Sequence, residues 1–174
     1  WVALVAFGAL PFHWSGIVPT YTDAFFESMS GLTTTGATVI TGLDTAPPGL
    51  LFWRGLLQWL GGLGIIVMAI AVLPMLQIGG MQLFKAEAFD TAEKILPRAT
   101  QISTSITLVF IAMTGICAIA YMAVGMAADD AVIHAMTTVA TGGFSTKDDS
   151  IGFFNNPAVE WIAIIFMFLG SIPF

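Results

Sequence analysis

The chain has 174 residues, of which 57% are hydrophobic and only 9% are charged, and its mean hydropathy is +0.90. About a quarter of the residues in soluble domains are charged. This composition therefore excludes a soluble domain and predicts an integral membrane protein embedded in a lipid bilayer. Eleven acidic residues against five basic ones exclude a nucleic-acid partner, because nucleic acid is bound by a basic surface.

The chain begins and ends inside apolar runs that are shorter than the roughly 20 residues of a full membrane span. Residues 1–12 predict the end of a first transmembrane helix, closed by Pro11. We therefore expect a piece of a longer protein whose first and last helices are cut. His13 has no second ligand nearby, so we interpret it as a polar residue at the lipid headgroup level rather than a metal ligand.

A short helix is predicted next, over residues 20–32. Thr20 or Thr22 supplies its N-terminal cap, and Asp23 lies in its first turn. The helix is too short to cross a bilayer, so we expect it to be re-entrant and surrounded by protein or by a water-filled cavity. Its carboxyl end is the negative end of the helix dipole and points at the threonine-rich turn over residues 33–37, which favours a cation there.

A second full span is predicted over residues 50–77, after a Pro- and Gly-rich stretch at residues 41–49. Arg54 is interpreted as a side chain that snorkels to the membrane boundary beside Trp53, with a role as a gating cation as the alternative. Four glycines predict a close helix contact along this span: Gly55, Gly61, Gly62 and Gly64.

Residues 79–100 form a hydrophilic connection with three of the five basic residues, Lys85, Lys94 and Arg98. The positive-inside rule places this connection in the cytoplasm, so the polar turn opens towards the outside. Pro97 is expected in the first turn of a third helix, which continues through the uncharged run at residues 102–124. The single cysteine, Cys117, lies in this run and is interpreted as a small packing residue.

The pattern of short helix and polar turn then occurs a second time. His134 stands 107 positions after Glu27, and residues 134–145 follow the order of residues 27–38. We interpret His134 as a packing or hydrogen-bonding group behind the second turn rather than as a direct ion or proton ligand. The duplication makes a functional role for both turns much more specific than either turn alone would be.

A fourth helix is predicted from Ala158. A one-residue change of offset aligns Trp161 with Trp53 and Gly170 with Gly62. The sequence therefore predicts an all-α membrane protein built from tandem repeats of helix, re-entrant helix, polar turn and helix. The expected units are the first repeat at residues 1–77, the cytoplasmic connection at residues 78–100 and the second repeat at residues 101–174.

The chemistry of both turns suits a monovalent cation. A crossing cation needs oxygens in place of its hydration shell, and threonine hydroxyls and backbone carbonyls supply them without a fixed charge. Carboxylates would hold the ion too tightly or favour divalent ions. Glycine permits the backbone angles that a carbonyl-inward loop requires. Five aspartates on the predicted outer side are expected either to raise the local cation concentration or simply to be solvated: Asp44, Asp129, Asp130, Asp148 and Asp149.

Residues 28–38 and 134–145 resemble the first and second pore loops of the TrkH subunit family of bacterial potassium uptake systems, in the superfamily that includes KtrB and the plant HKT transporters. The resemblance extends to residues 53–55 and 96–98 and covers essentially the whole chain. It implies tandem repeats of helix, pore helix, filter loop and helix, as in potassium channels, in which Gly36 and Gly143 correspond to the family's filter glycines. By resemblance, potassium is bound by the backbone carbonyls of Thr34, Thr35, Gly36, Thr141, Gly142 and Gly143, flanked by Thr33, Ala37, Ala140 and Phe144.

The resemblance implies potassium transport through a carbonyl-lined selectivity filter, by the pore-forming subunit of an uptake system in the bacterial inner membrane. It also implies a homodimer, regulation by a cytoplasmic TrkA-type nucleotide-binding subunit, and two further repeats beyond this chain. We expect no enzymatic activity and no cofactor, because two distant histidines and one apolar cysteine provide no catalytic or metal-binding set. The alternative is another cation transporter with re-entrant loops, such as a sodium/potassium symporter, although such transporters usually contain inverted rather than parallel repeats.

Overall fold

The structure, a computed structural model, describes the backbone of residues 1–76 and 92–172 and the side chains of residues 1–64, 68 and 103–172. Within these ranges the regular structure is entirely helical, which confirms the predicted fold class. The α-helices are α1 (Val2–Ser15), α2 (Tyr21–Leu32), α3 (Pro48–Leu76), α4 (Ala92–Ala123), α5 (Ala128–Val139) and α6 (Pro157–Ser171), and two short 3-10 helices are η1 (Leu43–Thr45) and η3 (Ser150–Phe154).

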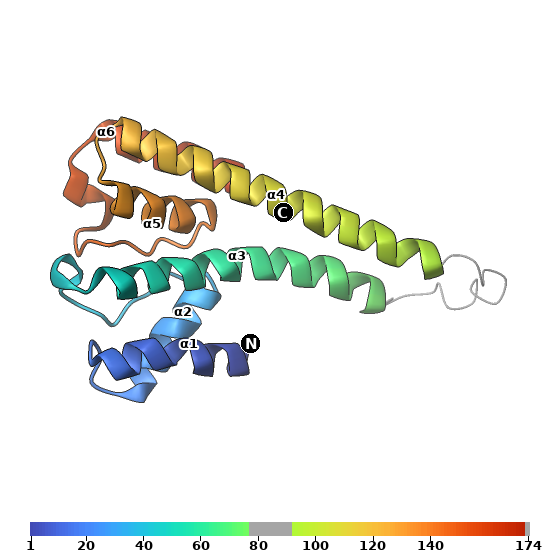
Figure 1. Cartoon of the computed structure of the whole chain (residues 1–174), viewed down its shortest axis with the longest axis horizontal. Coiled ribbons are helices and arrows are strands. Elements are labelled where there is room, and N and C mark those ends of the chain that lie inside the picture. The colour runs from blue at the N-terminus through green and yellow to red at the C-terminus, as the bar shows by residue number, and fades with distance from the viewer. Residues whose placement is uncertain (77–91, 173–174) are drawn as a thin grey trace.

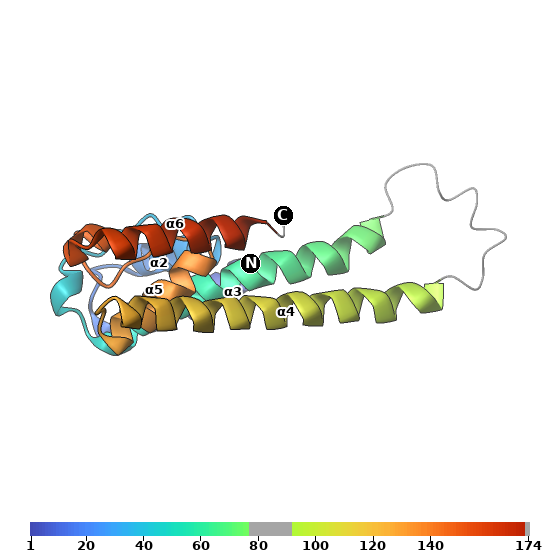
Figure 2. The same cartoon turned by 90° about the horizontal axis from the view of Figure 1, so that it is seen from above.

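The two longest helices, α3 and α4, run side by side along the molecule (Figure 1). The C-terminal end of α3 and the N-terminal end of α4 extend beyond the other labelled helices. Around their opposite ends, α1 and α2 pack on one side of α3, and α5 packs between α3 and α4. In the second repeat, Figure 2 shows α6 on one side of α5 and α4 on the other, and α4 also contacts α6. The order of helix, short helix, turn and helix thus occurs twice, as predicted.

The apolar helices leave large surfaces uncovered. Ser103–Ala123 of α4 has 21 residues and a mean hydropathy of 2.2, so among the described residues it is long and apolar enough to cross a membrane. α1 and α6 are shorter apolar helices. Phe7, Ile119 and Phe168 are 72%, 64% and 68% exposed on these three helices. Such faces suit contact with lipid or with further protein segments, not with water.

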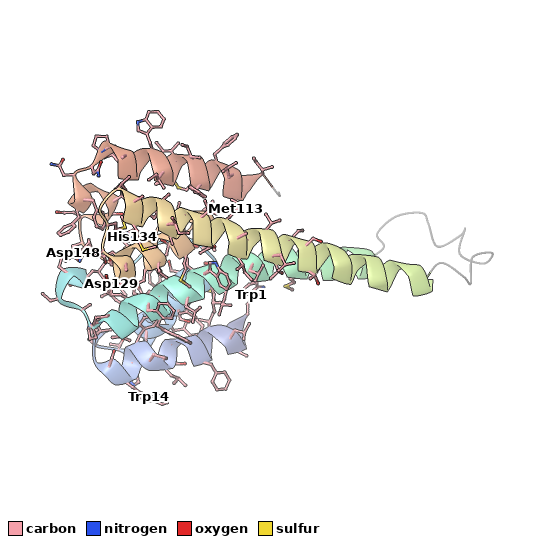
Figure 3. All side chains as sticks on the ribbon, turned by 45° about the horizontal axis from the view of Figure 1, so that its top comes forward. Trp1, Trp14, Met113, Asp129, His134 and Asp148 are labelled. Atoms are coloured by element: carbon pink, nitrogen blue, oxygen red, sulfur yellow. The ribbon has the colours of Figure 1, made fainter. Side chains whose placement is uncertain are left out.

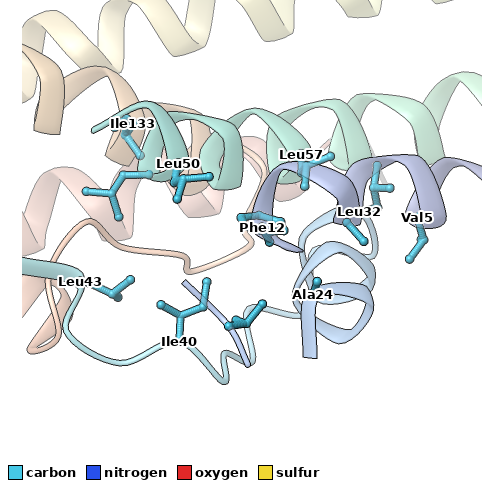
Figure 4. Packing of buried hydrophobic residues seen from close by; sticks show 12 residues of the cluster. Val5, Phe12, Ala24, Leu32, Ile40, Leu43, Leu50, Leu57 and Ile133 are labelled. Carbon is cyan, nitrogen blue, oxygen red and sulfur yellow. The ribbon is translucent and has the colours of Figure 1, made fainter. Parts of the chain in front are cut away.

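Two apolar clusters form the core, and α3 contributes to both. The first cluster joins α1, α2 and α3 through residues such as Phe12, Leu32 and Leu57 (Figure 4). The second joins α4, α5 and α6 and includes the fully buried Cys117, which confirms the interpretation of this cysteine as a packing residue. Trp59 of α3 packs against this second cluster and donates a hydrogen bond to the Thr114 hydroxyl at 3.0 Å.

Glycines allow the short helices to approach their neighbours closely. A Cβ added to Gly61 of α3 would overlap the carbonyl oxygen of Leu32, and a Cβ on Gly170 of α6 would lie 2.5 Å from the carbonyl oxygen of Val139. Leu32 and Val139 are equivalent positions at the ends of α2 and α5. By contact, therefore, Gly61 and not Gly62 is the counterpart of Gly170, and the predicted offset at this point is wrong by one residue.

The start of α2 is confirmed at the first of the two predicted caps. The Thr20 hydroxyl accepts the Asp23 N–H at 3.1 Å and donates to the Asp23 carboxylate at 2.7 Å. This arrangement satisfies a backbone donor that a helix leaves free in its first turn. The short α2 and α5 each have 12 residues.

Two predicted helix boundaries are wrong. α1 continues through Pro11 and ends at Ser15, and the capping Gly16 has a φ of 72°, the left-handed conformation typical of a helix C-terminus. α4 begins at Ala92, so Pro97 lies inside the helix and not in its first turn. In both cases the proline removes one backbone N–H donor from the helix without ending it. The predicted boundary between the first repeat and the connection, and Lys85, lie outside the described residues.

Candidate functional site

Each candidate turn begins with the same hydrogen bonds at the end of its short helix. After α2, the N–H groups of Thr33, Thr34 and Thr35 donate to the carbonyl oxygens of Met29, Gly31 and Ser30 at 2.9, 2.9 and 3.0 Å. After α5, the N–H groups of Ala140, Thr141 and Gly142 donate to the carbonyl oxygens of Met136, Thr138 and Thr137 at 3.2, 3.0 and 2.9 Å. The two turns therefore match position by position.

These bonds orient the carbonyl groups of the turns. In a trans peptide the C=O and the N–H of the same peptide unit point in opposite directions, and the described chain contains no cis peptide bond. Because the Thr35 N–H points back at α2, the Thr34 carbonyl points away from that helix. The Thr141 carbonyl points away from α5 for the same reason. Both turns thus present oxygens on the side opposite their short helix.

The backbone conformation is also duplicated. Thr34 and Thr141 have φ angles of 54° and 53°, and Gly36 and Gly143 have φ angles of 80° and 82°. A threonine in the left-handed region is uncommon, because its branched side chain crowds the backbone there. Glycine adopts the left-handed region without this crowding. The positive φ at Gly36 and Gly143 therefore gives a conformational reason for glycine at the two predicted positions.

The two turns lie next to each other. A Cβ added to Gly36 would overlap the carbonyl oxygen of Gly142, so the first turn contacts the second through bare backbone. The threonine hydroxyls of the first turn bond among themselves. The Thr33 hydroxyl donates to the Met29 carbonyl at 2.8 Å, and lies 2.8 Å from the Thr35 hydroxyl. Because these two hydroxyls are engaged with each other and with Met29, the backbone carbonyls are the oxygens of this turn that remain available to a cation.

Equivalent side chains support the two turns from behind. Glu27 is fully buried; its carboxylate accepts the Thr38 hydroxyl at 2.9 and 3.0 Å and the Val39 N–H at 3.1 Å. In the second copy His134 replaces Glu27, and its Nε2 lies 3.0 Å from the hydroxyl of Ser145, the counterpart of Thr38. The other ring nitrogen, Nδ1, lies 2.8 Å from the Asp130 carbonyl oxygen. That carbonyl can only accept, so Nδ1 donates a proton to it, and in the neutral ring Nε2 then accepts from Ser145.

These contacts confirm the interpretation of His134 as a hydrogen-bonding group behind the second turn. Figure 3 shows it at the same end of the molecule as Asp129 and Asp148. Asp148 has a local role, because its carboxylate oxygen accepts the N–H groups of Gly42 and Leu43 at 3.0 and 3.1 Å. The contact ties the exit of the second turn to the exit of the first. Asp130 also has local partners, because its carboxylate accepts the Thr146 hydroxyl and lies 3.6 Å from the Lys147 ammonium. Asp44, Asp129 and Asp149 are exposed, and their role as a surface charge stays a prediction.

Arg54 overturns its interpretation as a snorkelling side chain. It is only 1% exposed, and its Nε lies 2.8 Å from the Glu27 carboxylate. Its Nη1 donates to the Ser145 carbonyl at 2.8 Å, its Nη2 donates to Thr38 at 3.2 Å, and its guanidinium lies 4.2 Å from the centre of the Phe144 ring. The neighbouring tryptophan suggested the membrane boundary, but a buried carboxylate makes burial of the arginine favourable.

The sequence contained a signal for this pair that went unused. Glu27 and Arg54 are lone charges of opposite sign within apolar segments, and such charges tend to pair with each other. Gln58, one turn after Arg54, was also missed; it is fully buried, and its Oε1 accepts the Phe144 N–H at 3.0 Å. Among the described residues, no group of three or more His, Cys, Asp or Glu is arranged to hold a metal ion.

The profile of the TrkH family, described as cation transport protein, matches residues 1–174. The chain belongs to the TrkH family. Transporters of this family are membrane proteins, in agreement with the apolar composition and the exposed apolar helices. The match confirms the family resemblance inferred from the two polar turns.

The relatives within the TrkH family are similar along the whole chain. The Trk system potassium uptake protein TrkH of Salmonella typhimurium is 48% identical over 98% of this chain and 36% of its own length. TrkI of Halomonas elongata is 43% identical over 100% of this chain and 36% of its own. The crystal structure of the potassium transporter TrkH from Vibrio parahaemolyticus gives a TM-score of 0.80 at 44% identity, over 95% of this chain and 33% of that chain. The chain thus spans about a third of the length of these relatives.

Proposed function

We propose that this chain forms two segments of a selectivity filter through which potassium crosses the membrane. The observation that carries the proposal is the duplicated turn: both copies have the same helix-end hydrogen bonds and the same alternation of φ, and they touch through Gly36 and Gly142. Two adjacent rows of carbonyl oxygens without a fixed charge suit a monovalent cation in transit. Membership of the TrkH family and the names of the relatives give independent support.

The ion ligands in this proposal are backbone oxygens. Potassium is bound by the carbonyls of Thr34, Thr35 and Gly36 in the first turn and of Thr141, Gly142 and Gly143 in the second. Neutral carbonyls bind the ion weakly enough for it to leave. The acidic surface residues raise the cation concentration at the outer entrance.

The complete protein, in this proposal, is a multi-pass pore-forming subunit of a potassium uptake system in the bacterial inner membrane. Two further repeats close the filter, two copies associate as a homodimer, and a TrkA-type nucleotide-binding subunit regulates transport from the cytoplasm. It needs no cofactor and has no enzymatic activity. The alternative, a sodium/potassium symporter with re-entrant loops, fits less well because the two repeats here run parallel, from helix through short helix to helix.

Replacing Gly36 or Gly143 by serine in the full-length protein should lower the ratio of potassium to sodium flux by about tenfold, since a side chain in the left-handed region costs about 1–2 kcal/mol. Gly36→Ser should be the more severe, because its Cβ also overlaps Gly142, whereas nothing lies within 4 Å of a Cβ on Gly143. Fluxes are measured in proteoliposomes. Gly152→Ser, on an open surface position without positive φ, is the matched control. Unchanged flux ratios in both filter variants would contradict the assignment.

A further inference from the structure

Gln58 lies between the two turns, on a helix of the first repeat, yet it binds the second turn. Its Oε1 accepts the Phe144 N–H at 3.0 Å, and the side chain is fully buried. Its Nε2 has no hydrogen-bond partner among the described residues and lies 3.8 Å from the place where a Cβ on Gly36 would lie. The orientation of the amide is fixed, because an N–H donor requires the oxygen and not the nitrogen as its partner.

This hydrogen bond determines the direction of the carbonyl before Phe144. The Phe144 N–H and the Gly143 C=O belong to one peptide unit, and in a trans peptide they point in opposite directions. With the N–H directed at Gln58, the Gly143 carbonyl points away from α3. Gly143 has a φ of 82°, and glycine at positive φ moves readily between conformations. Without the bond, nothing among the described contacts holds this peptide unit.

Arg54 adds a second attachment from the same face of α3. Positions 54 and 58 are four residues apart and therefore lie one above the other on a helix. The Arg54 Nη1 donates to the Ser145 carbonyl at 2.8 Å, so the Gly143–Phe144 and Ser145–Thr146 peptide units are both held from the first repeat. Glu27 neutralises the guanidinium at 2.8 Å.

The approach of Gln58 to the second turn also explains a difference between the two copies. The second turn has Gly142 where the first has Thr35, although the φ of Gly142 is not in the left-handed region. A Cβ on Gly142 would overlap the amide group of Gln58. Glycine at this position is therefore required by the approach of Gln58, not by the backbone.

We propose that Gln58 is a positioning residue for ion selectivity: its amide oxygen holds the Gly143–Phe144 peptide unit so that the Gly143 carbonyl faces the ion. The inference rests on the proposed filter function. Its consequence is that the second filter segment takes its geometry from a helix of the first repeat. Loss of the acceptor should release one carbonyl of the filter while the rest of the fold stays intact.

The test compares Gln58→Met, which has a similar size but only a weakly accepting thioether sulfur, with Gln58→Glu, which keeps a carboxyl oxygen in place. Potassium and sodium fluxes are measured on the full-length protein in proteoliposomes at equal protein content. We expect Gln58→Met to lower the potassium-to-sodium ratio by about tenfold, as for one lost buried hydrogen bond. Gln58→Glu should retain most of the selectivity.

If Gln58→Met does not reach the membrane, Gln58→Asn replaces it. Its side chain is one methylene group shorter, so the amide oxygen lies too far from the Phe144 N–H, and we expect the same loss of selectivity.

Thr114→Val is the matched control. It removes another hydrogen bond between α3 and the second repeat, the Trp59–Thr114 bond at 3.0 Å, and should leave the flux ratio unchanged. A wild-type protein without preference for potassium over sodium would overturn the proposed function itself. If the wild type is selective, three outcomes would overturn the role of Gln58 but not the proposed function. They are Met and Asn variants that are as selective as wild type, a Glu variant that is no more selective than the Met variant, and the same loss of selectivity in Thr114→Val.

Discussion

At the scale of single residues, the two turns depend on a buried ion pair. Glu27 and Arg54 are 0% and 1% exposed and lie 2.8 Å apart, and together they bind residues of both copies. Glu27 bonds to Thr38 in the first copy, and Arg54 bonds to the Ser145 carbonyl in the second. Removing one member would leave the other charge buried without its partner, which costs more than removing both.

We predict that Glu27→Gln alone destabilises the full-length protein by about 3–5 kcal/mol, and that Glu27→Gln combined with Arg54→Gln costs less than the sum of the two single changes. Thermal unfolding of the purified protein in detergent measures all three. Lys147→Gln serves as the control, since its ion pair with Asp130 is longer, at 3.6 Å, and partly exposed; we expect less than about 1 kcal/mol there. Strictly additive single and double changes would contradict the coupling.

At the scale of elements, each short helix is positioned by a backbone carbonyl at its C-terminal end that packs against a glycine of a neighbouring helix. The Leu32 carbonyl at the end of α2 lies against Gly61 of α3, and the Val139 carbonyl at the end of α5 lies against Gly170 of α6. Close packing of backbones is the main attraction available between helices in lipid, because lipid tails are as apolar as the side chains. Each short helix is thus fixed at the end that carries its turn.

Gly61→Ala should therefore lower the thermal stability of the full-length protein, by about 1–3 kcal/mol, the usual range for overpacking. The added methyl group would overlap the Leu32 carbonyl and shift the end of α2. Gly115→Ala on α4 is the control, because nothing lies within 4 Å of its Cβ, and alanine is a better helix former than glycine. Equal melting temperatures for Gly61→Ala and wild type would show that the Leu32 carbonyl of α2 does not lie against Gly61 of α3.

At the scale of the whole molecule, α3 joins the two repeats. It belongs to the first apolar cluster through Leu57, packs against the second through Trp59, and carries the two side chains that bind the second turn. Asp148 adds a link between the two turn exits. The filter segments are therefore coupled by shared contacts, so an ion bound to both should stabilise the protein as a unit.

Potassium should accordingly raise the melting temperature of the full-length protein more than sodium at the same ionic strength. A ligand that binds only the folded state contributes about 2.7 kcal/mol at 100 times its dissociation constant. The Gly143→Ser variant should lose much of this difference, while Gly152→Ser keeps it. Equal melting temperatures of the wild type in the two salts would argue against a potassium site in these turns.

The sequence by itself determined the helical membrane fold, the duplication and the two glycines, because composition, periodicity and the spacing of repeated motifs are local properties. It located α2 closely, but it misplaced two helix boundaries at Pro11 and Pro97, where helices in this fold continue through a proline. Only the tertiary structure decided that Arg54 is buried in an ion pair and that Gln58 binds the second turn. Their partners, Glu27 and residues 144–145, lie 27 and about 90 positions away. Whether a polar side chain snorkels or pairs depends on which distant group the fold places beside it, because only a partner at hydrogen-bond distance offsets the cost of burial.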